Sequence, residues 1–356
     1  MGGRDPDRRD PAARQGHGAA PAPAARQGHG AAPAPAARQG RGALREPARV
    51  YHRRRLVAAG ALVMLLLAIA AATGAFSGSG EKPAARAEQV PPPAAPRELP
   101  RGGRSILPGR RIVAFYGAPQ SRELGALGIG TPDSAARRLA RQARAYEKAG
   151  RPVLPALELI AVIANADAGA DDLYRARQPD AVIRRYLRAA RRHDMLLLLD
   201  LQPGRSDFFA ETIRLERWLR EPDVGLALDP EWRVAAPDVP GHVIGSVDAR
   251  EVNATSAWLA QLVARHDLPQ KLFVVHQFTD DMVDDSQLLR RRELAMVLNA
   301  DGFGTRPVKV SKYHAFTRRA PSFHRGFKLF YEEDVGLMTP AQVMRLRPPP
   351  DVIVYE

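Results

Sequence analysis

The feature that most constrains the fold is a regular alternation of short apolar segments with amphipathic segments between Arg110 and Glu356. The apolar segments have the length of buried strands, and the segments between them carry apolar residues at helical spacing. Eight predicted strands and seven predicted helices indicate an α/β fold, a (β/α)₈ or TIM barrel, with an open doubly wound sheet as the alternative. The predicted strands are Ile112–Tyr116, Val153–Ile163, Met195–Leu201, Val224–Asp229, Lys271–Gln277, Leu294–Asn299, Phe327–Tyr331 and Val352–Tyr355. The predicted helices are Ser134–Ala149, Asp180–Arg192, Phe208–Leu219, Ala249–Arg265, Val283–Arg290, Val308–Arg318 and Pro340–Leu346.

The first 54 residues have a different composition from this folded region. A twelve-residue unit, A-A-R-Q-G-H-G-A-A-P-A-P, begins at Ala12, recurs from Ala24 and begins again at Ala36. Segments rich in Ala, Pro, Gly, Gln and Arg bury too little apolar surface to fold, so residues 1–54 are predicted to be a disordered arm.

The most apolar segment of the chain follows the arm. Leu56–Phe76 is uncharged over 21 residues, and as a helix it would span roughly 31 Å, the thickness of the hydrocarbon core of a bilayer. Three arginines, Arg53–Arg55, precede it, so the positive-inside rule places the arm in the cytoplasm and the rest of the chain outside. Residues 55–77 are predicted to be a transmembrane signal anchor, and a signal peptide cleaved near Ala72–Ala75 is the alternative.

A predicted linker follows the apolar segment, and the charge of the chain is unevenly distributed. Residues 78–109, which include Pro91–Pro93, are predicted to be a semi-extended linker. The net charge is +14, of which +8 falls in the first 55 residues, next to the apolar segment. That position favours membrane topology and argues against nucleic-acid binding by the folded domain. The chain has no cysteine, so it forms no disulfide and has no thiolate metal ligand.

A barrel predicts that chemistry lies at the carboxyl ends of its strands, and polar residues gather there. Some polarity is expected wherever strands emerge into water, and Asp200 and Asp301 would also suit helix caps. The candidates are Tyr116, Glu158, Asp200, Gln202, Asp229, Glu231, Asp248, Glu251, Asn253, His276, Gln277, Asp301, Lys328, Tyr331, Glu332 and Glu356.

The fourth predicted strand ends in the motif A-L-D-P-E-W (227–232), which carries two of the candidate carboxylates. Side chains alternate along a strand, so Asp229 and Glu231 are predicted to share a face. Buried carboxylates have shifted pKa values, which is the condition for acid–base chemistry. Glycoside hydrolysis uses such a pair, with Glu231 as the acid and Asp229 or Asp200 in support. The structural alternative is a helix N-cap at Asp229.

The remaining candidates fit a sugar site. Aromatic rings stack on sugar faces, a role for Tyr116, Trp232 and Tyr331, and polar side chains such as His276 and Gln277 bind hydroxyls. Asn253 is a further hydroxyl-binding candidate.

A divalent metal site is the second enzymatic option. Its predicted ligands are Glu158, Glu231, Asp248 and His276, an oxygen-rich set with one histidine. No H-x-H or H-E-x-x-H spacing supports this set, so no metal or other cofactor is predicted. The chain also contains no nucleophile-elbow serine and no Walker loop.

Residues 111–356 resemble an uncharacterised family of exported or membrane-tethered bacterial proteins with a glycosidase-like barrel. The motifs that carry the resemblance are A-F-Y-G (114–117), L-G-I-G (127–130), L-I-A-V-I-A-N-A-D (159–167), L-D-L-Q-P-G-R-S (199–206), A-L-D-P-E-W (227–232), G-S-V-D-A-R-E-V-N (245–253), V-H-Q-F-T (275–279), D-G-F-G (301–304) and G-F-K-L-F-Y-E-E-D (326–334). The D-P-E segment is also similar to the D-x-E motif of barrel muramidases and to the end of the chitinase strand-four motif. That similarity implies a proton-donor role for Glu231.

These features lead to one functional expectation and its opposing class. The chain is expected to be a membrane-anchored, extracytoplasmic, glycoside-hydrolase-like protein that acts on a cell-envelope carbohydrate such as peptidoglycan. A non-catalytic barrel that binds an envelope glycan or peptide, or that scaffolds a complex, is the alternative.

Overall fold

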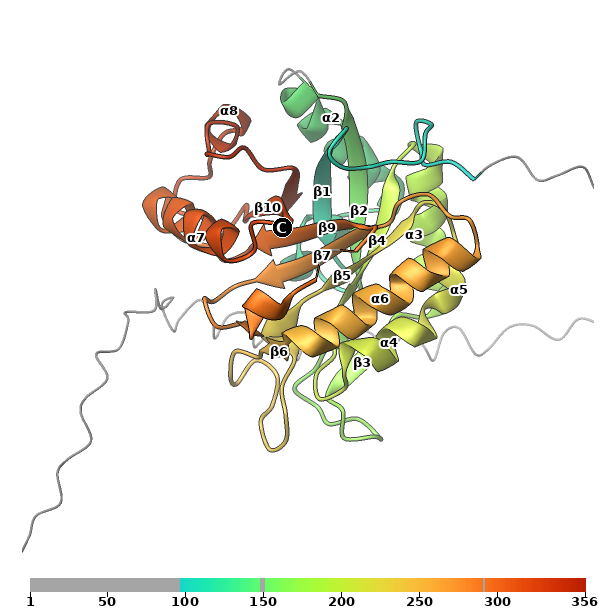
Figure 1. The fold of residues 1–356 in the computed structure, drawn as a ribbon, viewed down its shortest axis with the longest axis vertical. Helices are drawn as coiled ribbons and strands as arrows, with labels where there is room; N and C mark the ends of the chain where they lie inside the picture. The colour runs from blue at the N-terminus through green and yellow to red at the C-terminus, as the bar shows by residue number, and fades with distance from the viewer. Residues whose placement is uncertain (1–96, 148–150, 291) are drawn as a thin grey trace, which may run out of the picture. The chain divides into compact units, whose positions relative to one another are not determined.

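The computed structural model describes residues 97–147, 151–290 and 292–356, and this region contains a closed barrel of parallel strands (Figure 1). Each strand pairs in parallel with the next, and β1 pairs with both β2 and β11, which closes the ring. The open doubly wound sheet is therefore excluded. The barrel strands are β1 (Arg111–Gly117), β2 (Val153–Ala164), β4 (Leu196–Leu201), β5 (Val224–Leu228), β7 (Leu272–Gln277), β9 (Ala295–Ala300), β10 (His324–Leu329) and β11 (Val352–Tyr355).

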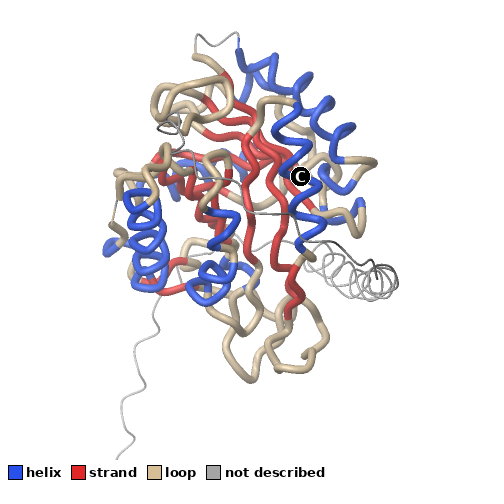
Figure 2. Tube along the Cα trace, turned by 90° about the vertical axis from the view of Figure 1, so that its right-hand side faces the viewer, coloured by secondary structure: helices blue, strands red, loops and turns tan. Residues whose placement is uncertain are grey.

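The barrel strands are apolar on both faces because both faces are buried. On β1, Ile112 and Ala114 belong to the apolar cluster inside the barrel. Val113 and Phe115 alternate with them and belong to the cluster between the strands and the helices. Parallel strands covered on both sides have this near-continuous apolar sequence. Figure 2 shows the strands side by side with the helices on their outer side.

Helices follow most of the strands and bury one apolar stripe each. On α2 that stripe includes Leu139, Ala143 and Tyr146. The predicted helix 208–219 is divided at Leu215, which ends α4 and precedes α5. The helices are α2 (Pro132–Glu147), α3 (Asp180–Arg192), α4 (Phe208–Arg214), α5 (Glu216–Leu219), α6 (Ala249–Arg265), α7 (Arg306–Arg319) and α8 (Pro340–Val343).

The predicted helix Val283–Arg290 is wrong. This segment forms a two-residue strand, β8 (Val283–Asp284), which pairs in parallel with β6 (Val247–Asp248), followed by a short 3₁₀ turn, η4 (Ser286–Leu288). Asp285 between them has φ 54°, the left-handed conformation, and a residue in that conformation interrupts a right-handed helix. One further short strand, β3 (Arg175–Arg177), pairs antiparallel with the end of β2.

Residues 97–109 close the N-terminal end of the barrel. Leu99, Ile106 and Leu107 are buried in the same apolar cluster as the inward residues of the strands. The amide Oε1 of Gln270 accepts hydrogen bonds from the backbone N–H groups of Ile106 (2.7 Å) and Leu107 (3.0 Å). The packed chain therefore begins by residue 97, within the segment that the sequence predicts as a linker.

The other N-terminal predictions fall outside the described residues. These are the arm at 1–54, the transmembrane helix at 55–77 and the first part of the linker. Among the residues that the structure describes, no helix has the length and apolar character needed to cross a bilayer.

Candidate active site

Polar side chains from all eight barrel strands meet at the carboxyl end of the barrel. The lumen is apolar lower down, so these groups form a polar layer on an apolar floor. Five of them lie on the strands themselves, and three occupy the first position after a strand. The layer comprises Tyr116, Glu158, Asp200, Asp229, His276, Asp301, Lys328 and Glu356.

Tyr116 lies at the centre of this layer. Its hydroxyl is 3.1 Å from Asp200 Oδ2 and 3.3 Å from Asp229 Oδ2. It also accepts a hydrogen bond of 2.9 Å from Nε2 of Gln202, whose Oε1 accepts from the backbone of Ala164. The phenol has one hydrogen and can donate to only one of the two carboxyl groups. A proton on Asp200 or Asp229 would supply the second hydrogen bond.

His276 lies between two carboxylates. Its Nε2 is 3.0 Å from Glu158 Oε1, and its Nδ1 is 3.0 Å from Asp301 Oδ2. Burial alone would lower the pKa of His276, but the hydrogen bonds to Asp301 and Glu158 outweigh it and raise that pKa well above its ordinary value. The charged imidazolium, which donates from both nitrogens, is the form that suits these contacts.

Lys328 connects the histidine side of the layer to Glu356. Its Nζ is 3.0 Å from Asp301 Oδ2 and 2.7 Å from Glu356 Oε2. The same ammonium group lies 3.8 Å from the centroid of the Tyr116 ring, a cation–π contact. Lys328 therefore links two carboxylates and the central phenol.

Acidic groups outnumber basic ones in the layer: five carboxyl groups accompany one lysine and one histidine. Burial, reinforced by the negative charge of Asp229, raises the pKa of Asp200 well above its ordinary range. Burial likewise raises the pKa of Tyr116, with Asp200 and Asp229 adding to the effect. This excess of negative charge in a buried environment favours bound protons or cations.

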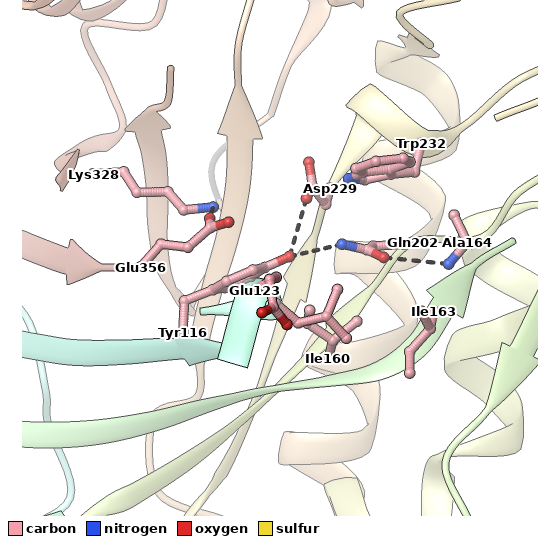
Figure 3. Close-up of a pocket in the computed structure, with 11 residues that line it drawn as sticks. Tyr116, Glu123, Ile160, Ile163, Ala164, Gln202, Asp229, Trp232, Lys328 and Glu356 are labelled. Carbon is pink, nitrogen blue, oxygen red and sulfur yellow. Dashed lines mark hydrogen bonds and ion pairs between the residues drawn. The ribbon is translucent and has the colours of Figure 1, made fainter. Parts of the chain in front are cut away.

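An open cavity lies against this layer (Figure 3). Figure 3 shows Tyr116 in the middle, with Lys328 and Glu356 on one side and Gln202 and Trp232 on the other. Three carboxylates reach it, and the apolar part of its wall comes mainly from the end of β2. The cavity is lined by Tyr116, Glu123, Leu124, Ile160, Ile163, Ala164, Gln202, Asp229, Trp232, Lys328 and Glu356.

Glu231 occupies a different position from Asp229. It lies in the 3₁₀ turn η3 (Pro230–Trp232) and is buried, but it is not among the residues that line the cavity. Its backbone carbonyl accepts a hydrogen bond from Gly245 at 2.7 Å. The turn begins directly after Asp229, so the strand alternation that the sequence suggests does not extend to Glu231.

Asp248 and Asn253 lie at the start of α6 and are not part of the layer. Asp248 is the N-cap of α6, where its Oδ1 accepts from the backbone of Arg250 at 2.7 Å. Asn253 donates to the backbone carbonyl of Leu288 at 2.8 Å. Of the four predicted metal ligands, the structure therefore brings together Glu158 and His276, but not Asp248.

Gln277, Tyr331 and Glu332 also lie outside the central network. Gln277 is buried and donates to loop carbonyls, including that of Thr279 at 3.3 Å. Tyr331 stacks on Tyr355 with ring centroids 5.2 Å apart. The side chain of Glu332 is exposed.

Two polar residues that the sequence analysis does not name join the site. Glu123 lies in the 3₁₀ turn η1 (Arg122–Leu124) and lines the cavity. Asn299 is buried on β9, with Nδ2 3.2 Å from His276 Nδ1. The position of Glu123 in the loop after the first strand was the available signal, because such loops line the mouth of a barrel.

Comparisons with known proteins reveal no family for this chain. No protein-family model matches it, and no curated protein matches it. Solved structures that are similar include a Ruminococcus gnavus sialic acid aldolase (12% identity, TM-score 0.32, covering 69% of this chain and 67% of that one). A Parabacteroides merdae beta-glucuronidase is also similar (11% identity, TM-score 0.33, covering 69% of this chain and 31% of that one). The Mycobacterium tuberculosis endoglucanase Cel6 is similar too (12% identity, TM-score 0.24, covering 61% of each chain). The chain thus spans less than two thirds of the last two proteins, and the barrel assignment rests on its own strand pairings.

Proposed function

We propose that this barrel is a glycoside-hydrolase-like enzyme that acts on a cell-envelope carbohydrate and that residues 55–77 anchor it outside the cytoplasm. The observation that carries the enzymatic part is that Asp229 and Glu356, which follow strands on different sides of the barrel, both line the cavity. Glycoside hydrolysis requires two carboxyl groups that flank one bond.

The contacts of the two carboxyl groups suggest their roles. Asp229 shares the Tyr116 hydroxyl with Asp200 and is the candidate general acid. Glu356 is paired with Lys328 and is the candidate base or nucleophile. Asp200 contacts the same hydroxyl and helps to hold Tyr116 against Asp229. Trp232 and Ile160 provide apolar surface for a sugar face.

This assignment gives Asp229 the role that the sequence favours for Glu231. Asp229 lines the cavity and Glu231 does not, and a general acid must come within hydrogen-bond reach of the leaving oxygen. Glu231 still has a place in the proposal as a neighbour that supports the turn after β5.

The test compares conservative variants of these acids in the full-length chain. Hydrolysis of purified peptidoglycan and of a panel of nitrophenyl glycosides is measured for the wild type, Asp229→Asn, Glu356→Gln and Glu231→Gln. The proposal expects turnover by the wild type, near-complete loss in Asp229→Asn and Glu356→Gln, and substantial activity in Glu231→Gln. Loss confined to Glu231→Gln would return the acid role to that residue.

Two further outcomes separate the alternatives. Glycan binding by the wild type without turnover on any substrate would identify a non-catalytic binding barrel. The tether is tested separately by alkaline extraction of membranes: the proposal expects the full chain to remain in the membrane, and a variant without residues 55–77 to be released.

A further inference from the structure

Three buried side chains at the floor of the polar layer form a donor set of the kind that binds metal ions. Glu158 on β2, Asp200 on β4 and His276 on β7 each offer one ligand atom, and these atoms lie within 4.8 Å of one another. All three side chains are fully buried. Donors bound to one transition-metal ion at about 2.1 Å lie about 3 to 4 Å apart, so a small inward movement would suffice.

Both carboxylates leave one oxygen open. Glu158 Oε1 contacts His276, and Asp200 Oδ2 accepts from Tyr116. Their other oxygens, Glu158 Oε2 and Asp200 Oδ1, are buried without a hydrogen-bond partner among the described residues. Asp200 Oδ1 lies 3.8 Å from His276 Nε2, so it faces the third donor. Buried polar atoms without partners are rare in folded proteins, and a bound cation would satisfy both of these oxygens.

The groups that would orient these ligands are already in place. A bound cation would displace the proton that His276 Nε2 shares with Glu158, while Asp301 Oδ2, 3.0 Å from Nδ1, would keep the other proton on Nδ1. The Tyr116 hydroxyl holds the other oxygen of Asp200. Hydrogen bonds of this kind to histidine and carboxylate ligands are typical of metal centres.

From these contacts we infer a divalent-cation site formed by Glu158, Asp200 and His276, none of which lines the cavity, and separate from the proposed catalytic pair Asp229 and Glu356. One imidazole nitrogen with two carboxylates suits Mn²⁺, Fe²⁺ or Zn²⁺ better than Ca²⁺ or Mg²⁺, which favour all-oxygen sites. The five carboxyl groups of the layer make a bound dication electrostatically favourable, and Lys328 is already occupied by Asp301 and Glu356.

The site differs from the four-residue set that the sequence suggests. Asp248 caps α6 and Glu231 lies in the turn after β5, so neither belongs to the site, and Asp200 on β4 completes it instead. The three ligands are far apart in sequence, so no short motif marks the site. They come together only because the strands close into a barrel.

The test measures Mn²⁺ binding to the full-length chain after chelator treatment, by calorimetric titration and by loss of the free Mn²⁺ paramagnetic resonance signal. The inference expects one ion per chain for the wild type and a loss of affinity of at least about tenfold in Asp200→Asn and in His276→Gln. Asp301→Asn, which removes an orienting group, is expected to weaken binding by about 10- to 100-fold. Asp248→Asn is the matched control and should bind as the wild type does.

Controls keep the result interpretable. Histidines of the N-terminal arm, such as His17 and His29, are present in every variant, so the difference between variants reports the barrel site alone. Circular dichroism and thermal unfolding without metal establish that each variant is folded. Equal Mn²⁺ binding by the wild type and folded Asp200→Asn, or no binding by the wild type at millimolar Mn²⁺, would overturn the inference. Neither readout depends on turnover, so failure here leaves the proposed hydrolase untouched.

Discussion

The two ends of the barrel bury different kinds of groups. At the N-terminal end, residues 97–109 insert Leu99, Ile106 and Leu107 into the lumen, and polar atoms there pair at the periphery, as Arg104 does with Asp267. At the carboxyl end, the strands bury a connected set of acids with one lysine and one histidine. The same eight strands therefore carry an apolar plug at one end and a polar layer at the other.

The difference shows which end stabilises the fold and which is available for chemistry. Burial of apolar side chains stabilises a protein, whereas burial of charged groups costs free energy even when they are paired. The acidic excess at the carboxyl end is therefore a poor device for stability. Strained or costly groups of this kind concentrate at functional sites, and catalytic residues of barrels lie at this end.

The largest expected effect is on activity, from a change at the carboxyl end. Asp229→Asn should lower kcat by about 10²- to 10⁴-fold, the usual contribution of general acid–base catalysis. Its free energy of unfolding should stay unchanged or increase, because the substitution removes one of several buried acids. Steady-state kinetics and urea unfolding of the same preparation measure both quantities. A variant that loses activity only because it unfolds would contradict the contrast between the two ends.

The opposite result is expected at the N-terminal end. Ile106 is 1% exposed within the plug, and Ile106→Ala should lower the free energy of unfolding by about 2 to 5 kcal/mol through lost burial and a cavity. The kcat of the folded fraction should remain at the wild-type value, because Ile106 is not among the residues that line the cavity. Chemical denaturation gives the stability change. A large drop in kcat at full folding would show that the two ends are coupled.

Lys271 is a buried ionisable residue at the largely apolar N-terminal end of the barrel, and it predicts how stability changes with pH. It lies immediately before β7, its Nζ donates to the carbonyl of Glu221, and burial lowers its pKa to about 7. Between pH 7 and about pH 10 the unfolded chain holds a proton on this amine that the folded chain has released, so stability rises with pH in that window. Below pH 7 both states are protonated and this gain is absent.

The expected size of that rise is about 1 to 3 kcal/mol between pH 7 and pH 10. In Lys271→Met the Lys271 part of the pH dependence should disappear, so the curve of unfolding free energy against pH becomes flatter. Urea unfolding at several pH values compares the two curves. Parallel curves for the wild type and Lys271→Met would show that Lys271 keeps an ordinary pKa in the fold.

The barrel could be predicted from the sequence because its strands are short, apolar and evenly spaced. The segment 283–290 could not, since its apolar residues have helical spacing but Asp285 takes a left-handed conformation and Val283 pairs with Val247. The packing of residues 97–109 was also hidden, because Leu99 and Ile106 stand among prolines, glycines and arginines that resemble a linker.

The site could be predicted in part. Strand ends identified Tyr116, Asp200 and Asp229, because a barrel directs such residues to one face. Local spacing could not show that Asp229 lines the cavity and Glu231 does not. The difference arises from the 3₁₀ turn at Pro230, which changes the direction of the chain. The contacts of Asp200 could not be read from neighbours in sequence, because its partner Tyr116 is 84 residues away.

The smallest expected effect belongs to the rim, where a charged residue lies near the mouth without belonging to the layer. Glu332 is 52% exposed at its side chain and lies 3.5 Å from Arg122, which is 67% exposed. An exposed pair of this kind contributes about 0 to 1 kcal/mol, and salt screens it. Glu332→Gln should therefore change the unfolding free energy by less than about 1 kcal/mol, with kcat and KM near the wild-type values. Thermal unfolding at low and high salt, together with kinetics, checks this. A clear rise in KM would place Glu332 in substrate binding and extend the functional surface from the buried layer to the exposed rim.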